Sequence, residues 1–252
     1  MMKMKIGAQL YTVREFMQTP KDFEETIKKV AEIGYKYVQV SGIGNVPAKD
    51  VANICNAHGI EIVLTHTAPD RILHDIVNVI DEHHIMGAKY IGLGSMPESY
   101  ERSSTGVQSF IEDFAPSIRE IEASDMKFLY HNHAYEFEKH DGKRLIRHIM
   151  EGLPNIGFTL DTYWVQFAGG SPASWIRRLK GRVPVLHLKD MCVVQDKQRM
   201  CEVMTGNMSW PAIFAAILEG GVEYGMVEQD DCYGKDPFEC LKTSYNNLRG
   251  VI

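Results

Sequence analysis

The chain alternates between short segments rich in β-branched and aromatic residues and longer segments with apolar residues at helical spacing. A first strand is predicted at residues 4–10. A helix follows from Thr19 to Gly34, because threonine caps helices, the proline after it suits the first helical position, and glycine ends helices. Between these ends Phe23 and Ile27 recur on one helical face. The same strand and helix unit then repeats along the chain.

Eight strands and eight helices are predicted in this way. The strands lie at residues 4–10, 37–41, 60–66, 90–94, 127–133, 156–161, 183–190 and 225–229. The helices lie at residues 19–34, 48–58, 70–86, 104–124, 141–151, 172–179, 210–219 and 237–248. Helical connections imply parallel strands, and near-continuous apolar strands imply a sheet covered by helices. Eight units without a glycine-rich phosphate loop favour the α/β class and a closed (β/α)8 TIM barrel over a doubly wound open sheet.

Length and composition fit one such barrel. The chain has 252 residues, of which 44% are hydrophobic, and no linker rich in proline or serine divides it, so we expect a single domain over residues 1–252. Lys and Arg number 27 against 33 Asp and Glu, which gives a net charge of −6. This surface has no general attraction for nucleic-acid phosphates or anionic lipid, so we expect neither as a partner.

The cytoplasm is the predicted location. Residues 1–7 run on without the long apolar stretch of a signal peptide, and no segment approaches the roughly 18 uninterrupted apolar residues of a membrane-spanning helix. The five cysteines are scattered and form no CxxC pair, which suits a reducing compartment better than a disulfide framework. A homo-oligomer is compatible with the sequence.

Polar residues gather where the predicted strands end. In a (β/α)8 barrel the carboxyl ends of the strands form one rim, and catalytic groups come from that rim. The rim residues are Gln9, Tyr11, Gln39, Thr65, His66, Thr67, His131, Asn132, His133, Asp161, His187, Lys189, Asp190, Glu228, Gln229 and Asp230. The histidines of the predicted helices and loops are interpreted as solvated surface residues: His58, His74, His83, His84, His140 and His148.

Strand periodicity indicates which rim residues can meet. Side chains two residues apart share a face, so His187 shares one with the lysine that follows it, and His131 shares one with the next histidine. His131, Asp161, His187 and Glu228 can then converge on one point. This mixture of imidazoles and carboxylates suits one divalent ion, Mn²⁺, Zn²⁺, Co²⁺ or Mg²⁺, rather than Ca²⁺. The alternative is that these strand ends carry hydrogen-bonded structural residues only.

Five motifs at these strand ends resemble the sugar phosphate isomerase/epimerase superfamily, whose members have the xylose-isomerase-like barrel. The motifs are GAQLYTVR at 7–14, YHNHAYEF at 130–137, LDT at 160–162, HLKD at 187–190 and VE at 227–228. Each is short, but their order spans nearly the whole chain. The resemblance implies a TIM barrel that holds one divalent ion with a Glu, Asp, His, Glu set from strands five to eight.

The resemblance assigns the last three ligands to Asp161, His187 and Glu228. The family's usual Glu-Asn at the end of strand five is His-Asn here, so either His131 is the ligand or Glu136, just beyond it, reaches back. In similar epimerases the missing glutamate is also one of two catalytic bases. The strand-two position where many relatives carry Glu is Gln here as well. These departures weaken the case for epimerization by two glutamates.

The chemistry expected of such a site is proton removal beside a sugar carbonyl, with an enediolate stabilised by the ion. Glu228 is assigned as the base, and His131, His133 or Glu136 acts on the opposite face. Return of the proton there gives an isomerase or epimerase, whereas expulsion of a β-hydroxyl gives a lyase, dehydratase or, in reverse, a hydratase. The residues assigned to substrate binding are Gln9, Tyr11, His66, His133 and Lys189.

Two other classes of function share this scaffold. Endonuclease IV has the same barrel, and His-Asn-His echoes the name of a nuclease motif, but the basic stripe that DNA binding requires is missing from the sequence. A non-catalytic sugar-binding barrel is the other alternative, because fold alone does not imply activity. Arg199 and Gly206 are the only candidates for a phosphate site near strands seven and eight, so an unphosphorylated sugar is favoured.

Overall fold

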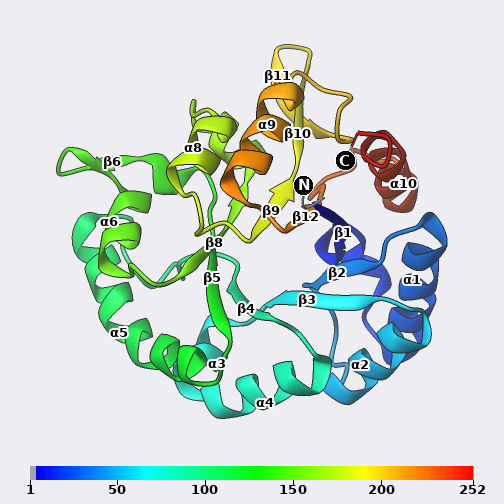
Figure 1. Cartoon of the computed structure of the whole chain (residues 1–252), viewed down its shortest axis with the longest axis horizontal. Helices are drawn as coiled ribbons and strands as arrows, with labels where there is room; N and C mark the ends of the chain where they lie inside the picture. Colours follow the sequence, from blue (N-terminus) through cyan, green and yellow to red (C-terminus); the bar gives the residue numbers. More distant parts are fainter. Residues whose placement is uncertain (1–3, 252) are drawn as a thin grey trace.

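The computed structural model describes residues 4–251 and shows within them a closed barrel of eight parallel strands surrounded by helices (Figure 1). The barrel strands are β1 (Lys5–Gln9), β2 (Tyr37–Val40), β3 (Glu61–His66), β4 (Tyr90–Leu93), β5 (Lys127–His131), β8 (Gly157–Asp161), β9 (Val185–Leu188) and β12 (Tyr224–Val227). They pair in chain order, and β12 closes the ring against β1. The (β/α)8 fold predicted from the sequence is therefore confirmed.

Helices cover the outside of the strands. They are α1 (Pro20–Ile33), α2 (Ala48–Ala57), α3 (Pro69–His74), α4 (Ile76–Met86), α5 (Ser104–Ala123), α6 (Leu145–Gly152), α7 (Thr162–Phe167), α8 (Pro172–Arg178), α9 (Trp210–Gly220) and α10 (Pro237–Leu248). Short 3-10 segments follow two of the strands, at η1 (Leu10–Phe16) and η2 (Tyr135–Phe137). None of the helices between residues 4 and 251 is both long and apolar enough to cross a membrane.

Helix α1 shows how local sequence sets these boundaries. The Oγ1 atom of Thr19 accepts a hydrogen bond from the backbone N–H of Asp22, which satisfies one of the free donors of the first turn. Gly34 ends the helix with a φ of 121°, and a Cβ there would come within 2.6 Å of the ring of Tyr245. Only glycine combines that backbone conformation with that close approach.

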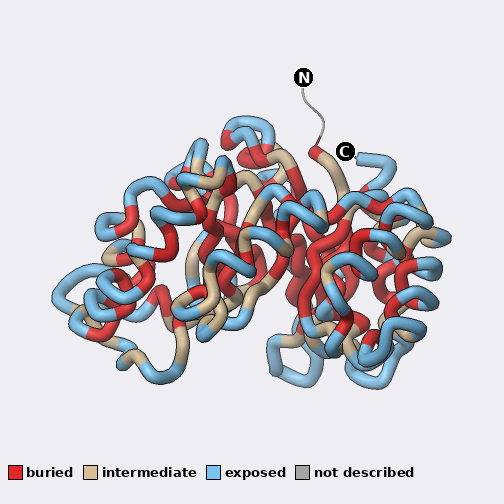
Figure 2. Tube along the Cα trace, turned by 90° about the horizontal axis from the view of Figure 1, so that it is seen from below, coloured by how far each residue is buried: buried red, intermediate tan, exposed pale blue. Residues whose placement is uncertain are grey.

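The apolar residues form a core between the strands and the covering helices and a smaller cluster at the strands themselves. Figure 2 shows buried chain in the interior of the molecule and exposed chain along its periphery. The smaller cluster consists of Val63, Leu64, Leu129, Val185, Tyr224 and Met226. Such packed side chains make the barrel interior a core rather than a channel.

Several predicted boundaries were wrong. The helix expected at 70–86 is divided at Asp75 into α3 and α4. The helix expected at 141–151 starts only at Leu145, because a hairpin of β6 (Lys139–His140) and β7 (Lys143–Arg144) precedes it. The helix α7 was not predicted.

Three of the predicted strands end two residues earlier than expected, and one of them, predicted at 225–229, ends at Val227. The strand predicted at 127–133 ends at His131. The strand predicted at 183–190 ends at Leu188, and the chain continues into an antiparallel hairpin of β10 (Asp190–Val194) and β11 (Lys197–Cys201). Figure 1 shows this hairpin projecting from the barrel beyond β9.

Candidate metal centre

Four side chains converge at the carboxyl end of the barrel. His131 ends β5, Asp161 ends β8, His187 lies in β9 and Glu228 follows β12. All four are buried, and one nitrogen or oxygen atom from each lies within 4.8 Å of those from the other three. The layer beneath them consists of the buried residues two positions earlier on each strand, which share their face: Leu129, Thr159, Val185 and Met226.

In both imidazoles of this group, the ring nitrogen that faces away from the carboxylates donates a hydrogen bond to an oxygen of a neighbouring strand or loop. His131 Nδ1 donates to the carbonyl oxygen of Gly94 at 2.7 Å, and His187 Nε2 donates to Gln39 Oε1 at 2.7 Å. These hydrogen bonds leave His131 Nε2 and His187 Nδ1 facing the two carboxylates, at 3.2 Å and 2.8 Å from the nearer oxygen. Metal-binding histidines are commonly oriented by such hydrogen bonds to the second nitrogen.

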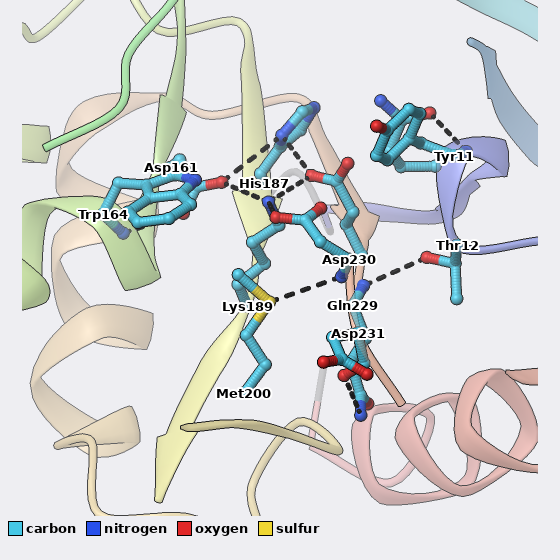
Figure 3. A network of polar contacts seen from close by, with 12 residues as sticks. Tyr11, Thr12, Asp161, Trp164, His187, Lys189, Met200, Gln229, Asp230 and Asp231 are labelled. Carbon is cyan, nitrogen blue, oxygen red and sulfur yellow. Dashed lines mark hydrogen bonds and ion pairs between the residues drawn. The ribbon is translucent and has the colours of Figure 1, made fainter. Parts of the chain in front are cut away.

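Lys189 brings a positive charge into the centre. Its side chain is buried, and its Nζ lies 3.1 Å from Asp161 Oδ2 and 2.9 Å from both Glu228 Oε2 and Asp230 Oδ2 (Figure 3). Burial alone would raise the pKa of Asp161 and of Glu228, but this ammonium and the neighbouring imidazoles lower both pKa values well below their ordinary range. Both groups are therefore carboxylates at neutral pH.

The pKa values of the other titratable groups of the centre are shifted in different directions. Burial and the charge of Glu228 raise the pKa of Asp230 to about 7. Burial would lower the pKa of His187, but the charges of Glu228 and Asp161 raise it above its ordinary value. For His131, burial and the nearby charge of His187 lower the pKa. One imidazole thus favours protonation and the other resists it.

Glu136 is held apart from the four converging residues. Its Oε1 accepts a hydrogen bond from the Tyr130 hydroxyl at 2.9 Å, and its Oε2 accepts one from the backbone N–H of His133 at 2.8 Å. Among the described residues, the converging group contains His131 and not Glu136. In this structure both oxygens of Glu136 are hydrogen-bonded within the turn after β5, so its carboxyl group lies outside the converging group.

His133 lies beyond the end of β5, beside the converging group. The centroid of its ring is 4.7 Å from that of His131 and 5.4 Å from that of Trp164, and its buried Nδ1 has no hydrogen-bond partner among the described residues. Burial and the charge of His131 lower the pKa of His133 to about 3. At neutral pH His133 is therefore an uncharged imidazole with a nitrogen free to interact with a ligand.

A cavity of about 320 Å³ opens over the centre. Its lining includes four of the residues assigned to substrate binding, namely Tyr11, His66, His133 and Lys189. Gln9, the fifth, is buried beneath, where its Oε1 accepts from the backbone N–H of Tyr11 at 3.1 Å. The ring of His66 packs 5.2 Å from that of His131.

Five residues line this cavity that were not among the predicted site residues: Arg14, Ser41, Gly94, Ser95 and Asp230. Arg14 stacks over the Tyr11 ring at 4.3 Å and ends the first of the five motifs, so the motif was its only signal. Asp230 lies two residues after Glu228, as Lys189 lies two residues after His187. Side chains at this spacing share one face of a strand, and this was the sequence signal for Asp230.

A second, larger cavity of about 400 Å³ adjoins the first at Ser41 and His66. Its charged lining residues, Arg71 and Glu82, form an ion pair at 2.7 Å. The two charged side chains of this second cavity therefore neutralise each other. The first cavity is the one lined by residues of the converging group.

The converging group fits a divalent metal ion. His187 Nδ1 is buried and makes no hydrogen bond of good geometry within residues 4–251, although it lies 2.8 Å from Glu228 Oε2. A buried nitrogen and carboxylate oxygen in this position can share a cation, and two imidazoles with two carboxylates suit Mn²⁺, Zn²⁺ or Co²⁺. His131, Asp161, His187 and Glu228 are the residues that would hold it.

Comparison with known proteins identifies the family. Residues 27–231 match the model of the xylose isomerase-like TIM barrel family, and the chain belongs to this family. The matched span contains all four converging residues. No curated protein matches the chain in sequence.

Solved structures with the same fold include several enzymes. A sugar phosphate isomerase/epimerase from Parabacteroides distasonis ATCC 8503 is 21% identical, with a TM-score of 0.83 over 98% of this chain and 94% of that one. The probable 3-DHS dehydratase AsbF from Bacillus anthracis is 12% identical, with a TM-score of 0.75 over 99% and 100%. The IOLI protein with a bound zinc atom is 15% identical, with a TM-score of 0.72 over 98% of both chains. At these identities the likeness concerns the fold.

Proposed function

We propose that the protein is a divalent-metal-dependent isomerase or epimerase that acts on a sugar or keto-sugar through proton abstraction to an enediolate. The observation that carries this proposal is the group formed by His131, Asp161, His187 and Glu228, with both imidazoles held by their outer nitrogens and both carboxylates ionised. The family and the isomerase/epimerase with the same fold support the reaction class.

The substrate of this proposal is a small polyhydroxylated molecule. The cavity over the centre, at about 320 Å³, is in the range of small-molecule sites, and its side chains can bind hydroxyl groups. The buried Nε2 of His66 and Nδ1 of His133 have no hydrogen-bond partner among the described residues. Both residues line the cavity and have a nitrogen available to hydrogen-bond a sugar hydroxyl.

A divalent ion, when bound, would withdraw electron density from the carbonyl and the adjacent hydroxyl oxygen of a sugar and so acidify the C–H of the hydroxyl-bearing carbon. Glu228 is the base that takes this proton, because it is ionised and lines the cavity. Asp161, His131 and His187 are the other residues that would hold the ion. His133, on the cavity wall, exchanges a proton with the opposite face of the substrate.

A lyase or dehydratase is the second candidate, and one observation favours it. Glu136 is directed away from the centre, so the second carboxylate of a two-glutamate epimerization is missing from the group, whereas the Lys189 ammonium lines the cavity. An ammonium there can donate a proton to a departing β-hydroxyl after Glu228 has removed the α-proton. The dehydratase with the same fold supports this alternative.

Metal binding tests the core of the proposal. Purified protein stripped with a chelator and titrated with Mn²⁺ in a calorimeter is expected to bind one ion. The Asp161→Ala and His187→Ala proteins are expected to lose this binding, because each lacks one of four ligand atoms. Binding as tight as that of the parent protein by both variants would refute the proposal.

Product analysis separates the two candidate reactions. The metal-loaded protein is incubated in D₂O with a panel of unphosphorylated aldoses, ketoses and keto-sugars. Deuterium bound to carbon in a product of otherwise unchanged mass identifies isomerization or epimerization, and loss of water identifies elimination. A Glu228→Gln protein serves as the control that should incorporate no deuterium.

A further inference from the structure

Lys189 has an unusual place for a lysine. It directly follows β9 and shares the inward face with His187, and only 1% of it is exposed. Lysine side chains are almost never fully buried unless they are paired. Here the ammonium contacts three carboxylates, those of Asp161, Glu228 and Asp230. Figure 3 shows its Nζ between the side chains that come from β8 on one side and from the end of β12 on the other.

The ammonium uses the same oxygen atoms that a metal ion would use. Asp161 Oδ2 is the oxygen that faces His131 Nε2 at 3.2 Å, and it lies 3.1 Å from Lys189 Nζ. Glu228 Oε2 is the oxygen that faces His187 Nδ1 at 2.8 Å, and it lies 2.9 Å from the same Nζ. An ion within bonding distance of these oxygens, about 2.0–2.2 Å, would stand against the ammonium in a water-poor site, where like charges repel strongly.

The third contact, with Asp230, provides the ammonium with an alternative ion-pair partner. Asp230 Oδ2 is 2.9 Å from Nζ but is not part of the converging group of four. Its side chain is partly open to the cavity, at 27% exposure, whereas those of Asp161 and Glu228 are at 0% and 4%. Lys189 can therefore release the two ligand carboxylates and remain paired with Asp230.

From these contacts we infer that Lys189 is an internal competitor of the metal ion. In the metal-free protein its ammonium neutralises Asp161 and Glu228, and on metal binding it turns to Asp230 alone and faces the substrate cavity. The metal affinity of the centre is thereby set below what its four ligands would give. The inference rests on the proposed metal site and adds to it a residue that controls how readily the site is filled.

Metal affinity with the lysine removed tests this inference. Chelator-stripped wild-type and Lys189→Met proteins are titrated with Mn²⁺ by calorimetry, and the melting temperature is recorded with and without Mn²⁺. Methionine keeps the length of the side chain without its charge. The Lys189→Met protein is expected to bind Mn²⁺ at least tenfold more tightly than wild type and to show a larger rise in melting temperature on metal addition. Equal or weaker binding would overturn the inference.

A second variant changes the affinity in the opposite direction. In the Asp230→Asn protein the ammonium loses its alternative anionic partner and is held by the ligand carboxylates, so Mn²⁺ binding is expected to weaken severalfold. Tighter or unchanged binding by this variant contradicts the inference, and this result does not depend on whether the Lys189→Met protein folds. Lys89→Met is the matched control, because Lys89 also pairs with a carboxylate of this barrel, Glu223 at 3.3 Å, but far from the centre.

The outcomes separate this inference from the proposed function. If wild type binds Mn²⁺, Asp161→Ala abolishes binding and Lys189→Met leaves it unchanged, the metal site stands and the competition is refuted. If neither wild type nor Lys189→Met binds Mn²⁺ or Zn²⁺, both the proposed function and the inference fail. Binding strengthened by Lys189→Met and weakened by Asp230→Asn, with Lys89→Met unchanged, supports both.

Discussion

At each end of the barrel a glutamate next to β12 forms ion pairs with lysine. At one end these pairs are exposed to solvent, and at the other they are buried. At the amino end, Glu223 precedes β12 and pairs with Lys5 at 3.5 Å and Lys89 at 3.3 Å, and all three side chains are at least 30% exposed. At the carboxyl end, Glu228 follows β12 and pairs with Lys189 at 2.9 Å, with both side chains below 5% exposure.

Solvent decides what the two clusters can do. Exposed pairs are screened by water and salt and contribute about 0–1 kcal/mol each. Buried charges have lost their hydration, so each depends on its partners, and removing one partner costs about 3–5 kcal/mol. That dependence shifts the pKa values of the groups at the carboxyl end, whereas the amino end stabilises the fold only slightly. The following predictions test this contrast, from the largest expected effect to the smallest.

Neutralising the buried lysine should cost more stability than neutralising an exposed one. The metal-free Lys189→Met protein is expected to unfold with about 3–5 kcal/mol less free energy than wild type, because it leaves buried carboxylates without their cation. Lys89→Met is expected to cost less than about 1 kcal/mol. Urea denaturation followed by circular dichroism measures both. Similar losses for the two variants would remove the distinction between the ends.

Glu136 should make stability depend on pH. Burial raises its pKa from 4.5 to about 7, so the folded protein keeps this proton to higher pH than the unfolded chain does. Its contribution is fully present below pH 4.5 and is lost as the pH rises to about 7, by about 3 kcal/mol in total. Urea unfolding at pH 5 and pH 8 should show this loss in wild type and a smaller one in Glu136→Gln. An equal loss in both proteins would assign it to other groups.

Replacing the glutamate at the carboxyl end should weaken metal binding, whereas replacing the glutamate at the amino end should not. Glu228→Gln is expected to weaken Mn²⁺ binding about 100-fold, equivalent to about 2.7 kcal/mol, because an amide is a poor substitute for an ionised ligand. Glu223→Gln, the same change five residues earlier, is expected to leave Mn²⁺ affinity unchanged. Calorimetric titration of both stripped proteins is the measurement, and a comparable loss in the Glu223→Gln protein would refute the assignment of the ligand.

The smallest effect concerns Lys5, whose ammonium also lies 3.4 Å from the hydroxyl of Tyr224. Lys5→Met is expected to lower the free energy of unfolding only slightly, and the difference should shrink further in 1 M NaCl, where the Debye screening length is about 3 Å. Urea curves at low and high salt check this. A loss that is insensitive to salt would mean that the apolar stem of Lys5, rather than its charge, supplies the stability.

Much of the architecture could be predicted because the signals are local. Thr19 and Gly34 bound a helix by capping and by a positive φ, and the alternation of β-branched runs with helical periodicity marked all eight barrel strands. The errors arose where tertiary contacts override the local pattern. His83 was expected at the surface, yet it is buried with its Nε2 at 2.8 Å from Thr65 Oγ1, and only the neighbouring Val79, one helical turn earlier, hinted at that face.

The candidate site shows the same division. The identity of the rim residues followed from strand ends and from the period of two along each strand, so His131, Asp161, His187 and Glu228 could be grouped before the structure was known. The role of Glu136 could not, because a 3-10 turn after β5 directs its carboxyl group to Tyr130 instead of the centre. Sequence spacing does not specify which way a loop residue turns.

The sequence by itself determined the repeating β/α units, the closure into a barrel and the kinds of side chain on the rim, because these depend on periodicity and chain-local capping. The tertiary structure alone decided that the ammonium of Lys189 lies within 3.1 Å of two ligand carboxylates, and that the equivalent charges at the other end remain in water. The physical reason is that charge interactions depend on distance and on exclusion of solvent, and both are set by residues that are far apart in the chain.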